Sequence, residues 1–298
     1  MAKPIAILVG DLHARETVPE CRVDDFLEAQ FNKWRWLKKL WEETKVPIVY
    51  AGDVFDKWKS SPWLLSKVQE LLPPGLFIVG QHDISGHSMK NLEKSNLNVL
   101  LTSKLGWTEI TDMGYLDNKD FTAWGYSWGT GLKKMLSGNS LPCLAVVHKF
   151  VYEKEIPWPG CDGLSAEEAL EQLSGYELVL CGDNHQKFIY EKGNQKLLNP
   201  GSFLRMSADQ QNFAPAVFIW KDDNSLEEVP VPIEKGVVSR EHIERKKETD
   251  EKMNAWVESL NSDIEITLSF EENIKRYKEE NPNVPDHVWD IVMTHVKA

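Results

Sequence analysis

Five short apolar segments of the chain each end in residues that can bind a metal ion. The segments lie at 5–10, 46–52, 75–80, 143–148 and 177–182. Each is rich in Val, Ile and Leu and does not alternate with polar residues, which predicts strands buried on both faces. The residues at their ends are Asp11, His13, Asp53, Gln81, His82, Asp83, His148, Asp183 and His185. Four of the eight histidines of the chain fall in this set, so we first consider metal chemistry.

Each of these motifs alone is better explained without a metal ion. An Asp-x-His sequence after a strand, such as Asp11 and His13, is typical of a polar turn, and the Gly-Asp-x-x-Asp sequence at Asp53 is typical of the start of a loop. The combination is different, because the carboxyl ends of strands in an open α/β sheet converge on one crevice. Five strand ends in sequence order therefore predict one shared metal site.

Aspartate and histidine are the residue types that a pair of divalent ions requires. Two ions about 3.5 to 4 Å apart can hold a phosphate, lower the pKa of a bound water and stabilise the leaving oxygen. One carboxylate has to bridge both ions, with histidine and carboxylate ligands on either side. The pattern therefore indicates phosphate chemistry.

With these motifs the sequence resembles the calcineurin-like metallophosphoesterases over residues 5–205. That family carries Asp-x-His, Gly-Asp-x-x-Asp, Gly-Asn-His-Asp/Glu, a lone His and Gly-His-x-His in this order, and the "NPGS" segment at 199–202 resembles one that follows the last motif. The resemblance implies an α/β fold with a metallophosphoesterase-like two-sheet β-sandwich flanked by helices. It also implies two divalent metal ions and a phosphoric ester hydrolase.

The same resemblance implies a role for each motif residue. The ligands of the first ion would be Asp11, His13, Asp53 and His185, and those of the second would be Asp53, Gln81, His148 and Asp183, with Asp53 bridging. His82 would protonate the leaving group or steady the transition state, which suits an imidazole because its pKa lies near the operating pH. Asp83 would orient His82.

Two positions depart from the family pattern. Gln81 stands where Asn is usual, and Asp183 stands where the first His of Gly-His-x-His is usual. The longer Gln requires the loop to sit back, or else the second ion is held loosely. Three oxygen donors and one nitrogen favour Mn²⁺ or Mg²⁺ over Zn²⁺ in the second site. We therefore expect Mn²⁺, with Mg²⁺, Fe²⁺ and Zn²⁺ as alternatives.

Within the family, the chain most resembles the SbcD-type DNA-repair nucleases and related phage-encoded phosphoesterases. This likeness implies hydrolysis of phosphodiester bonds in DNA and a partner ATPase of the SbcC type. The alternatives are a phosphatase acting on small phosphomonoesters or nucleotides, and a non-catalytic scaffold; we favour catalysis because Gln81 and Asp183 still offer oxygen ligands. Arg15, Lys149 and Arg205 adjoin the motifs and could contact phosphate or be structural.

Composition limits the class of protein. The net charge of -12 argues against coating of nucleic acid by bulk electrostatics, although bound divalent ions supply positive charge locally. No apolar run approaches the roughly 18 residues that span a bilayer, and no signal-peptide pattern follows the first apolar run. Four scattered cysteines favour reduced thiols, so we expect a cytoplasmic protein that uses no membrane. The oligomeric state stays open.

The rest of the chain supplies the elements that position these residues. Helical spacing predicts helices over 23–44 and 61–72, the latter capped by Ser61, and alternation with the strands is typical of parallel α/β pairing. The aromatic, glycine-rich segment 107–128 favours antiparallel strands, and hairpins are predicted around 192–194 and over 215–233.

We expect two domains, a metallophosphoesterase domain at 1–234 and a helical C-terminal appendage at 235–298. In the appendage, Ser269 and Glu272 form the pattern of a capping box, and a proline after Asn281 predicts a helix end.

Overall fold

The computed structural model describes residues 2–111, 115–117, 119–135, 140–263 and 270–296. The chain divides into two compact units, Met1–Arg240 and Glu241–Ala298. The domain boundary expected at residue 234 stays a prediction.

The first sheet of the larger unit has six strands. In spatial order they are β14 (Leu226–Pro230), β13 (Ala216–Lys221), β1 (Pro4–Val9), β2 (Ile48–Tyr50), β3 (Leu76–Phe77) and β4 (Thr108–Glu109). Strands β1 to β4 pair in parallel, whereas β13 is antiparallel to both of its neighbours. Helix α1 (Phe26–Thr44) connects β1 to β2, and α2 (Pro62–Leu71) connects β2 to β3. The predicted succession of strand and helix is confirmed in this sheet.

The second sheet also has six strands among the described residues. In spatial order they are β11 (Phe188–Lys192), β12 (Gln195–Asn199), β10 (Leu178–Gly182), β7 (Cys143–His148), β6 (Thr122–Tyr126) and β5 (Tyr115–Asp117). The four central strands are parallel and the two edge strands are antiparallel to their neighbours. A separate parallel pair, β8 (Val151–Tyr152) and β9 (Leu164–Ser165), lies between β7 and α4 (Ala166–Gln172) in sequence.

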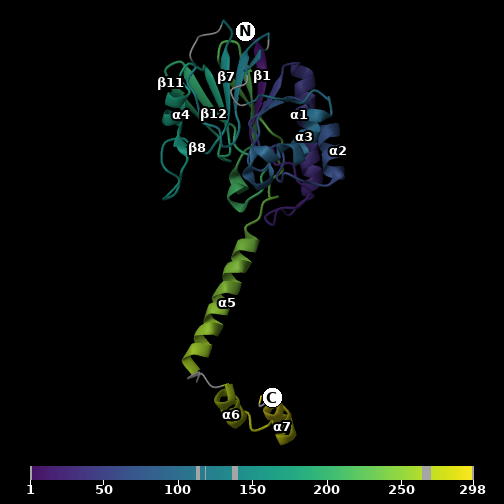
Figure 1. Cartoon of the computed structure of the whole chain (residues 1–298), viewed down its shortest axis with the longest axis vertical. Helices are drawn as coiled ribbons and strands as arrows, with labels where there is room; N and C mark the ends of the chain where they lie inside the picture. Colours follow the sequence, from purple (N-terminus) through teal and green to yellow (C-terminus); the bar gives the residue numbers. More distant parts are fainter. Residues whose placement is uncertain (1, 112–114, 118, 136–139, 264–269, 297–298) are drawn as a thin grey trace. The chain divides into compact units, whose positions relative to one another are not determined.

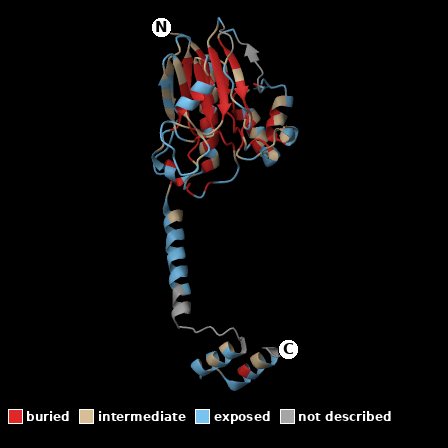
Figure 2. Ribbon diagram, turned by 60° about the vertical axis from the view of Figure 1, so that its left-hand side comes forward, coloured by how far each residue is buried: buried red, intermediate tan, exposed pale blue. Residues whose placement is uncertain are grey.

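Three hydrophobic clusters show how the layers stack. One lies between the first sheet and its helices, a second joins the facing sides of the two sheets, and a third covers the other side of the second sheet under α4. Along β1, Ile7 and Val9 belong to the first cluster and Ala6 and Leu8 to the second, because successive side chains of a strand point to opposite faces. Figure 1 shows α1, α2 and α3 (Asn96–Thr102) on one side of the strands and α4 on the other, and Figure 2 shows the strands as the buried interior. The α/β fold with two mixed sheets flanked by helices is confirmed.

Local sequence signals explain several element boundaries. The side chain of Ser61 accepts a hydrogen bond from the N–H of Leu64 and caps α2, and Pro62 occupies its first position, as predicted. Both predicted hairpins form, β11 with β12 and β13 with β14. The segment 107–128 is partly different from the expectation: β5 and β6 are antiparallel, but β4 belongs to the first sheet and β6 pairs with β7 in parallel.

The second unit consists of α5 (Glu241–Asp263), α6 (Phe270–Glu280) and α7 (Asp286–Val296). Most described side chains of α5 are exposed, whereas Trp289 of α7 is buried against Tyr277 of α6, with ring centroids 6.1 Å apart. Helix α6 ends just before Asn281, as predicted, while the cap expected at Ser269 lies outside the described residues. In the part of the chain that the structure describes, no helix is long and apolar enough to cross a membrane.

Candidate metal centre

The glycines that precede the motif residues allow the strand ends of both sheets to approach one another. A Cβ atom on Gly80 would lie 2.0 Å from Asp53 Oδ1, and one on Gly52 would lie 2.3 Å from His148 Nδ1. A Cβ on Gly182 would lie 2.5 Å from the carbonyl oxygen of Ala51. No larger residue fits these three positions, so the glycines of the motifs are packing requirements of the site.

Three of the predicted ligands adopt a left-handed backbone conformation. Their φ angles are 47° for His13, 45° for Asp53 and 82° for Asp183. Such conformations cost roughly 1–3 kcal/mol each in a residue other than glycine, and they cluster at functional sites. The loops after β1, β2 and β10 are therefore strained where they present the predicted ligands.

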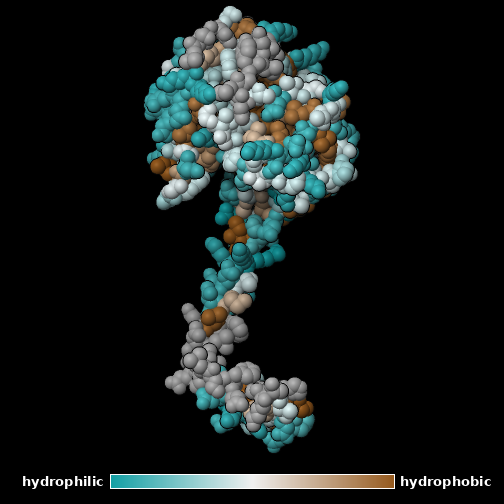
Figure 3. Space-filling model, in the orientation of Figure 1, coloured by the Kyte–Doolittle hydropathy of each residue, from teal (hydrophilic) through white to brown (hydrophobic). Residues whose placement is uncertain are grey.

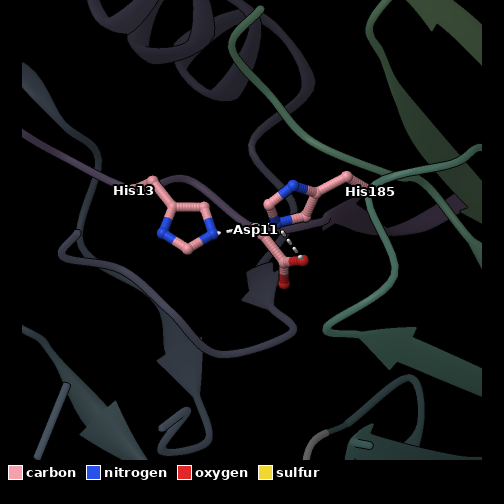
Figure 4. Close-up of side chains that lie close together, drawn as sticks. All are labelled: Asp11, His13 and His185. Carbon is pink, nitrogen blue, oxygen red and sulfur yellow. Dashed lines mark hydrogen bonds and ion pairs between the residues drawn. The ribbon is translucent and has the colours of Figure 1, made fainter. Parts of the chain in front are cut away.

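Asp11, His13 and His185 form what we call the first donor group. The two imidazole Nε2 atoms lie 3.0 Å apart, and His185 Nε2 lies 3.6 Å from Asp11 Oδ2. Figure 4 shows all three side chains directed toward one another. Burial lowers the pKa of His13 to about 3 and also lowers the pKa of His185. Both rings are therefore neutral at pH 7, which is the form that binds metal.

The second donor group consists of Asp53, Gln81, His148 and Asp183. His148 Nε2 lies 3.3 Å from Asp53 Oδ2, and the Gln81 amide donates a hydrogen bond of 2.6 Å to Asp183 Oδ1. His148 Nδ1 donates to the carbonyl oxygen of Ala51 at 2.6 Å, which leaves its Nε2 for the centre of the site. Asp53 also lies 3.8 Å from His13 Nε2, so its carboxylate faces both donor groups.

The carboxylates in and around the second donor group favour a bound cation. Burial alone would lower the pKa of His148, but the carboxylates of Asp53 and Asp11 raise it to about 10. Burial and the neighbouring charges of Asp53 and Asp183 hold the pKa of Asp11 well above its ordinary value, although His148 opposes the shift. A divalent ion would replace the proton on His148, because a ligating histidine must be neutral.

Unpartnered buried atoms test whether a metal ion fits. Among the described residues, eight buried side-chain atoms have no hydrogen-bond partner, and four of them belong to this site. They are His13 Nδ1, Asp53 Oδ2, Gln81 Oε1 and His148 Nε2. Asp53 Oδ2 and His148 Nε2 attract each other across 3.3 Å, whereas an unpartnered buried atom such as Gln81 Oε1 costs about 1–3 kcal/mol. The last three are the atoms expected to bind the second ion, so the residues present fit a pair of divalent ions.

The structure corrects the role expected for Asp83. His82 is exposed, and its Nδ1 donates to the carbonyl oxygen of Asp56 at 2.9 Å, so Asp56 and not Asp83 orients the ring. Asp83 is fully buried, and its carboxylate accepts hydrogen bonds from the backbone N–H groups of Val54, Phe55 and Gly80. Burial and the nearby Asp53 raise the pKa of Asp83 to about 7. Asp83 therefore fixes the loop that carries Asp53, because three otherwise unsatisfied donors point at it.

His82 is nevertheless close to the donor groups. Its backbone N–H donates to Asp53 Oδ1 at 2.9 Å, and its ring centroid lies 4.9 Å from that of His13. The described residues contain a second group with metal-ligand spacing, made of His13, Asp53 and His82. The imidazole of His82 thus faces the site from the solvent side.

Two residues inside the motifs, Asp56 and Asn184, help to build the site although the sequence predicted no role for them. Asp56 is the second aspartate of Gly-Asp-x-x-Asp, and besides holding His82 it lies 3.3 Å from Arg15. Asn184 lies between Asp183 and His185, and its side-chain amide donates to the carbonyl oxygen of Val151 at 2.7 Å. The place of each residue in its motif was the only sequence signal for these roles. In both hydrogen bonds the acceptor is a backbone carbonyl oxygen, and such an acceptor cannot be recognised from residue type.

The three cations considered as phosphate contacts have different surroundings. Arg205 is buried, and its guanidinium donates to the carbonyl oxygens of Gln211 and Glu234, so it is structural. Arg15 is bound to Asp56 and Thr17. Lys149 lines a cavity of about 410 Å³ together with His148, Asp183, Trp128 and Thr130. Of the three, Lys149 is the cation that faces an open space beside the donor groups.

A second hollow also adjoins the donor groups. This Trp158 groove has a volume of about 560 Å³ and is lined by Phe150, Trp158, Asp183, His185, Lys154 and Lys187, among others. Asp183 and Phe150 line both hollows. The donor groups therefore lie along an open surface that continues past them.

A comparison with protein families places the chain. The model of the calcineurin-like phosphoesterase family matches residues 6–187, and the chain belongs to this family. It is a metal-dependent phosphoester hydrolase, and the family binds two divalent metal ions. No curated protein matches the chain.

The solved structures that are similar to this chain include two hydrolases. One is a phosphodiesterase from an archaeon, with 13% identity and a TM-score of 0.40, covering 76% of this chain and 98% of the other. The second is the phosphopantetheinyl hydrolase PptH from Mycobacterium tuberculosis, with 11% identity and a TM-score of 0.44, covering 76% of this chain and 96% of the other. At these identities neither likeness identifies a substrate.

Proposed function

We propose that this calcineurin-like phosphoesterase hydrolyses phosphodiester bonds in DNA. The observation that carries the proposal is the pair of hollows that share Asp183 in their linings, about 410 and 560 Å³ in volume. A phosphodiester continues on both sides of the scissile phosphorus, whereas a monoester ends there. A site whose donor groups adjoin two hollows has room for both ester groups of a diester.

The ligand assignment is part of this proposal. The first donor group with Asp53 would hold one ion, and the second donor group would hold the other, with Asp53 shared between them. When bound, such ions hold the phosphate and lower the pKa of an attacking water. The oxygen-rich second group favours Mn²⁺.

His82 would supply the proton for the leaving oxygen. Its Nδ1 keeps one proton in the hydrogen bond to the carbonyl oxygen of Asp56, so the proton that can be transferred would be a second one, on Nε2. Lys149 would contact a phosphate oxygen from the wall of the first hollow. Asp83 would take no part in proton transfer and would only hold the loop that carries Asp53 in place.

The proposal places the enzyme in the cytosol and gives it a partner ATPase of the SbcC type. All four cysteines, Cys21, Cys143, Cys161 and Cys181, are free, which suits a reducing compartment. Exposed apolar side chains on the C-terminal helices, such as Met253 and Ile291, offer a surface for a protein partner. Added ATPase of this type should raise DNA cleavage in the presence of ATP, and an unchanged rate would contradict the pairing.

The test is a Mn²⁺-dependent assay on bis(p-nitrophenyl) phosphate, p-nitrophenyl phosphate and linear duplex DNA. The wild type should hydrolyse the diester and DNA faster than the monoester. His82→Ala should lower kcat on DNA by about 10²- to 10⁴-fold, the usual contribution of a general acid. His287→Ala, which changes an exposed histidine of the second unit, is the matched control and should keep wild-type activity.

Each alternative function predicts a different result in this assay. Turnover of the monoester alone would identify a phosphatase and reject the nuclease. No metal-dependent turnover of any substrate would identify a scaffold; the unpartnered Asp53 Oδ2, Gln81 Oε1 and His148 Nε2 favour the enzyme. Asp53→Ala should abolish activity in either catalytic case, because its carboxylate faces both donor groups.

A further inference from the structure

A half-exposed tryptophan stands beside the candidate metal centre. Trp158 is 51% exposed, and its ring centroid lies 5.0 Å from that of Phe150 at an interplanar angle of 58°. Both rings line the Trp158 groove, whose lining also includes Asp183 and His185. A large aromatic surface left open to water next to a reaction site is typical of a binding surface.

The two rings are held in place by the surrounding backbone. The carbonyl oxygen of Phe150 accepts a hydrogen bond of 3.0 Å from the N–H of Leu164, and a Cβ on Gly163 would lie 2.6 Å from the Phe150 ring. The N–H of Cys161 donates to the carbonyl oxygen of Trp158 at 3.2 Å and closes a turn there. The backbone at both aromatic residues is therefore held by hydrogen bonds, and the Phe150 ring is packed closely against Gly163.

One buried hydrogen bond sets the position of this pair relative to the ligands. Asn184 is buried between Asp183 and His185, and its side chain donates to the carbonyl oxygen of Val151, the residue after Phe150. The carbonyl oxygen of Asn184 in turn accepts from Asn199 at 2.9 Å. A buried hydrogen bond thus joins the loop that carries two predicted ligands to the segment that carries Phe150.

We propose that Phe150 and Trp158 form a stacking platform for the nucleobase next to the scissile phosphate. The proposal rests on the proposed function and specifies its substrate. A phosphate held by the donor groups places the attached nucleoside in the adjoining groove, and flat aromatic walls bind the π-face of any base. Lys154 at the groove can face the following phosphate, whereas Lys187 is held by Glu228 and the carbonyl oxygen of Ala214. A base on this platform has left the duplex stack, so the substrate is single-stranded DNA or a frayed end.

The test compares two esters that share a leaving group. The p-nitrophenyl ester of thymidine 5′-monophosphate carries a base, and ethyl p-nitrophenyl phosphate does not. Trp158→Ala should raise KM for the thymidine ester about 10-fold, the loss that removal of one base-stacking ring usually causes. The ratio of the two KM values should move toward one, and Trp158→Phe should restore most of it. Trp63→Ala removes a ring of similar exposure, 46%, from α2 and should leave both KM values unchanged.

Three outcomes would overturn the platform. A parallel rise of both KM values would mean that Trp158 is structural, and unchanged values would assign its exposed ring to a protein partner. The same change in Trp63→Ala would mean that the effect is unspecific.

If the wild type hydrolyses neither ester, the proposed function fails. The stacking platform can then still be tested by calorimetry, which measures the binding of thymidine 5′-monophosphate in the presence of Mn²⁺. Trp158→Ala should weaken that binding about 10-fold, and equal affinity would refute the platform.

Discussion

The two donor groups of the site differ in their chemistry. The first has two imidazoles whose Nε2 atoms face each other at 3.0 Å, and its only oxygens are those of Asp11. The second has one imidazole, two carboxylates and an amide, and two of its members are already joined through the 2.6 Å hydrogen bond from Gln81 to Asp183. We therefore expect the second group, where the family pattern is changed, to set the metal preference.

Replacing Asp183 should have the largest effect on this contrast. Asp183→His restores the nitrogen that is usual in the family and removes a carboxylate, so the optimal metal should shift from Mn²⁺ toward Zn²⁺. The variant also loses the acceptor of the Gln81 amide, and total activity should fall by roughly 10- to 100-fold, the usual cost of disturbing the groups around a metal. The measurement is kcat on bis(p-nitrophenyl) phosphate with each metal in turn, and an unchanged metal profile would contradict the account.

Shortening Gln81 should have a smaller effect in the same group. Gln81→Asn keeps the amide oxygen but moves it back by one methylene, so the hydrogen bond to Asp183 lengthens. The Mn²⁺ concentration needed for half-maximal activity should rise by up to about 10-fold, the lower limit for changes beside a ligand. Gln81→Leu, of similar size and without a donor oxygen, should need far more Mn²⁺. Equal requirements in both variants would show that Gln81 Oε1 is not a ligand.

The sequence predicted the parts of the site that depend on side-chain type. Asp11, Asp53 and His148 end buried strands where expected, and the capping residue Ser61 was readable because caps use few residue types. The division of the strands between two sheets followed only from the family resemblance, since parallel strands in either sheet have the same apolar pattern.

Other features depend on the path of the backbone and could not be predicted. The ring of His82 is held by a carbonyl oxygen, which every residue possesses, so nothing distinguished Asp56 from Asp83 as its partner. The left-handed conformations of His13 and Asp183 likewise depend on the path of the loops, and neither residue type predicts such a conformation.

The number of metal ions per chain tests the central claim most directly. Native mass spectrometry of the Mn²⁺-loaded protein should find two ions in the wild type. His185→Ala removes a member of the first donor group and His148→Ala a member of the second, and each variant should retain one ion. A single ion in the wild type, or two in both variants, would contradict the assignment of these residues to a pair of metal sites.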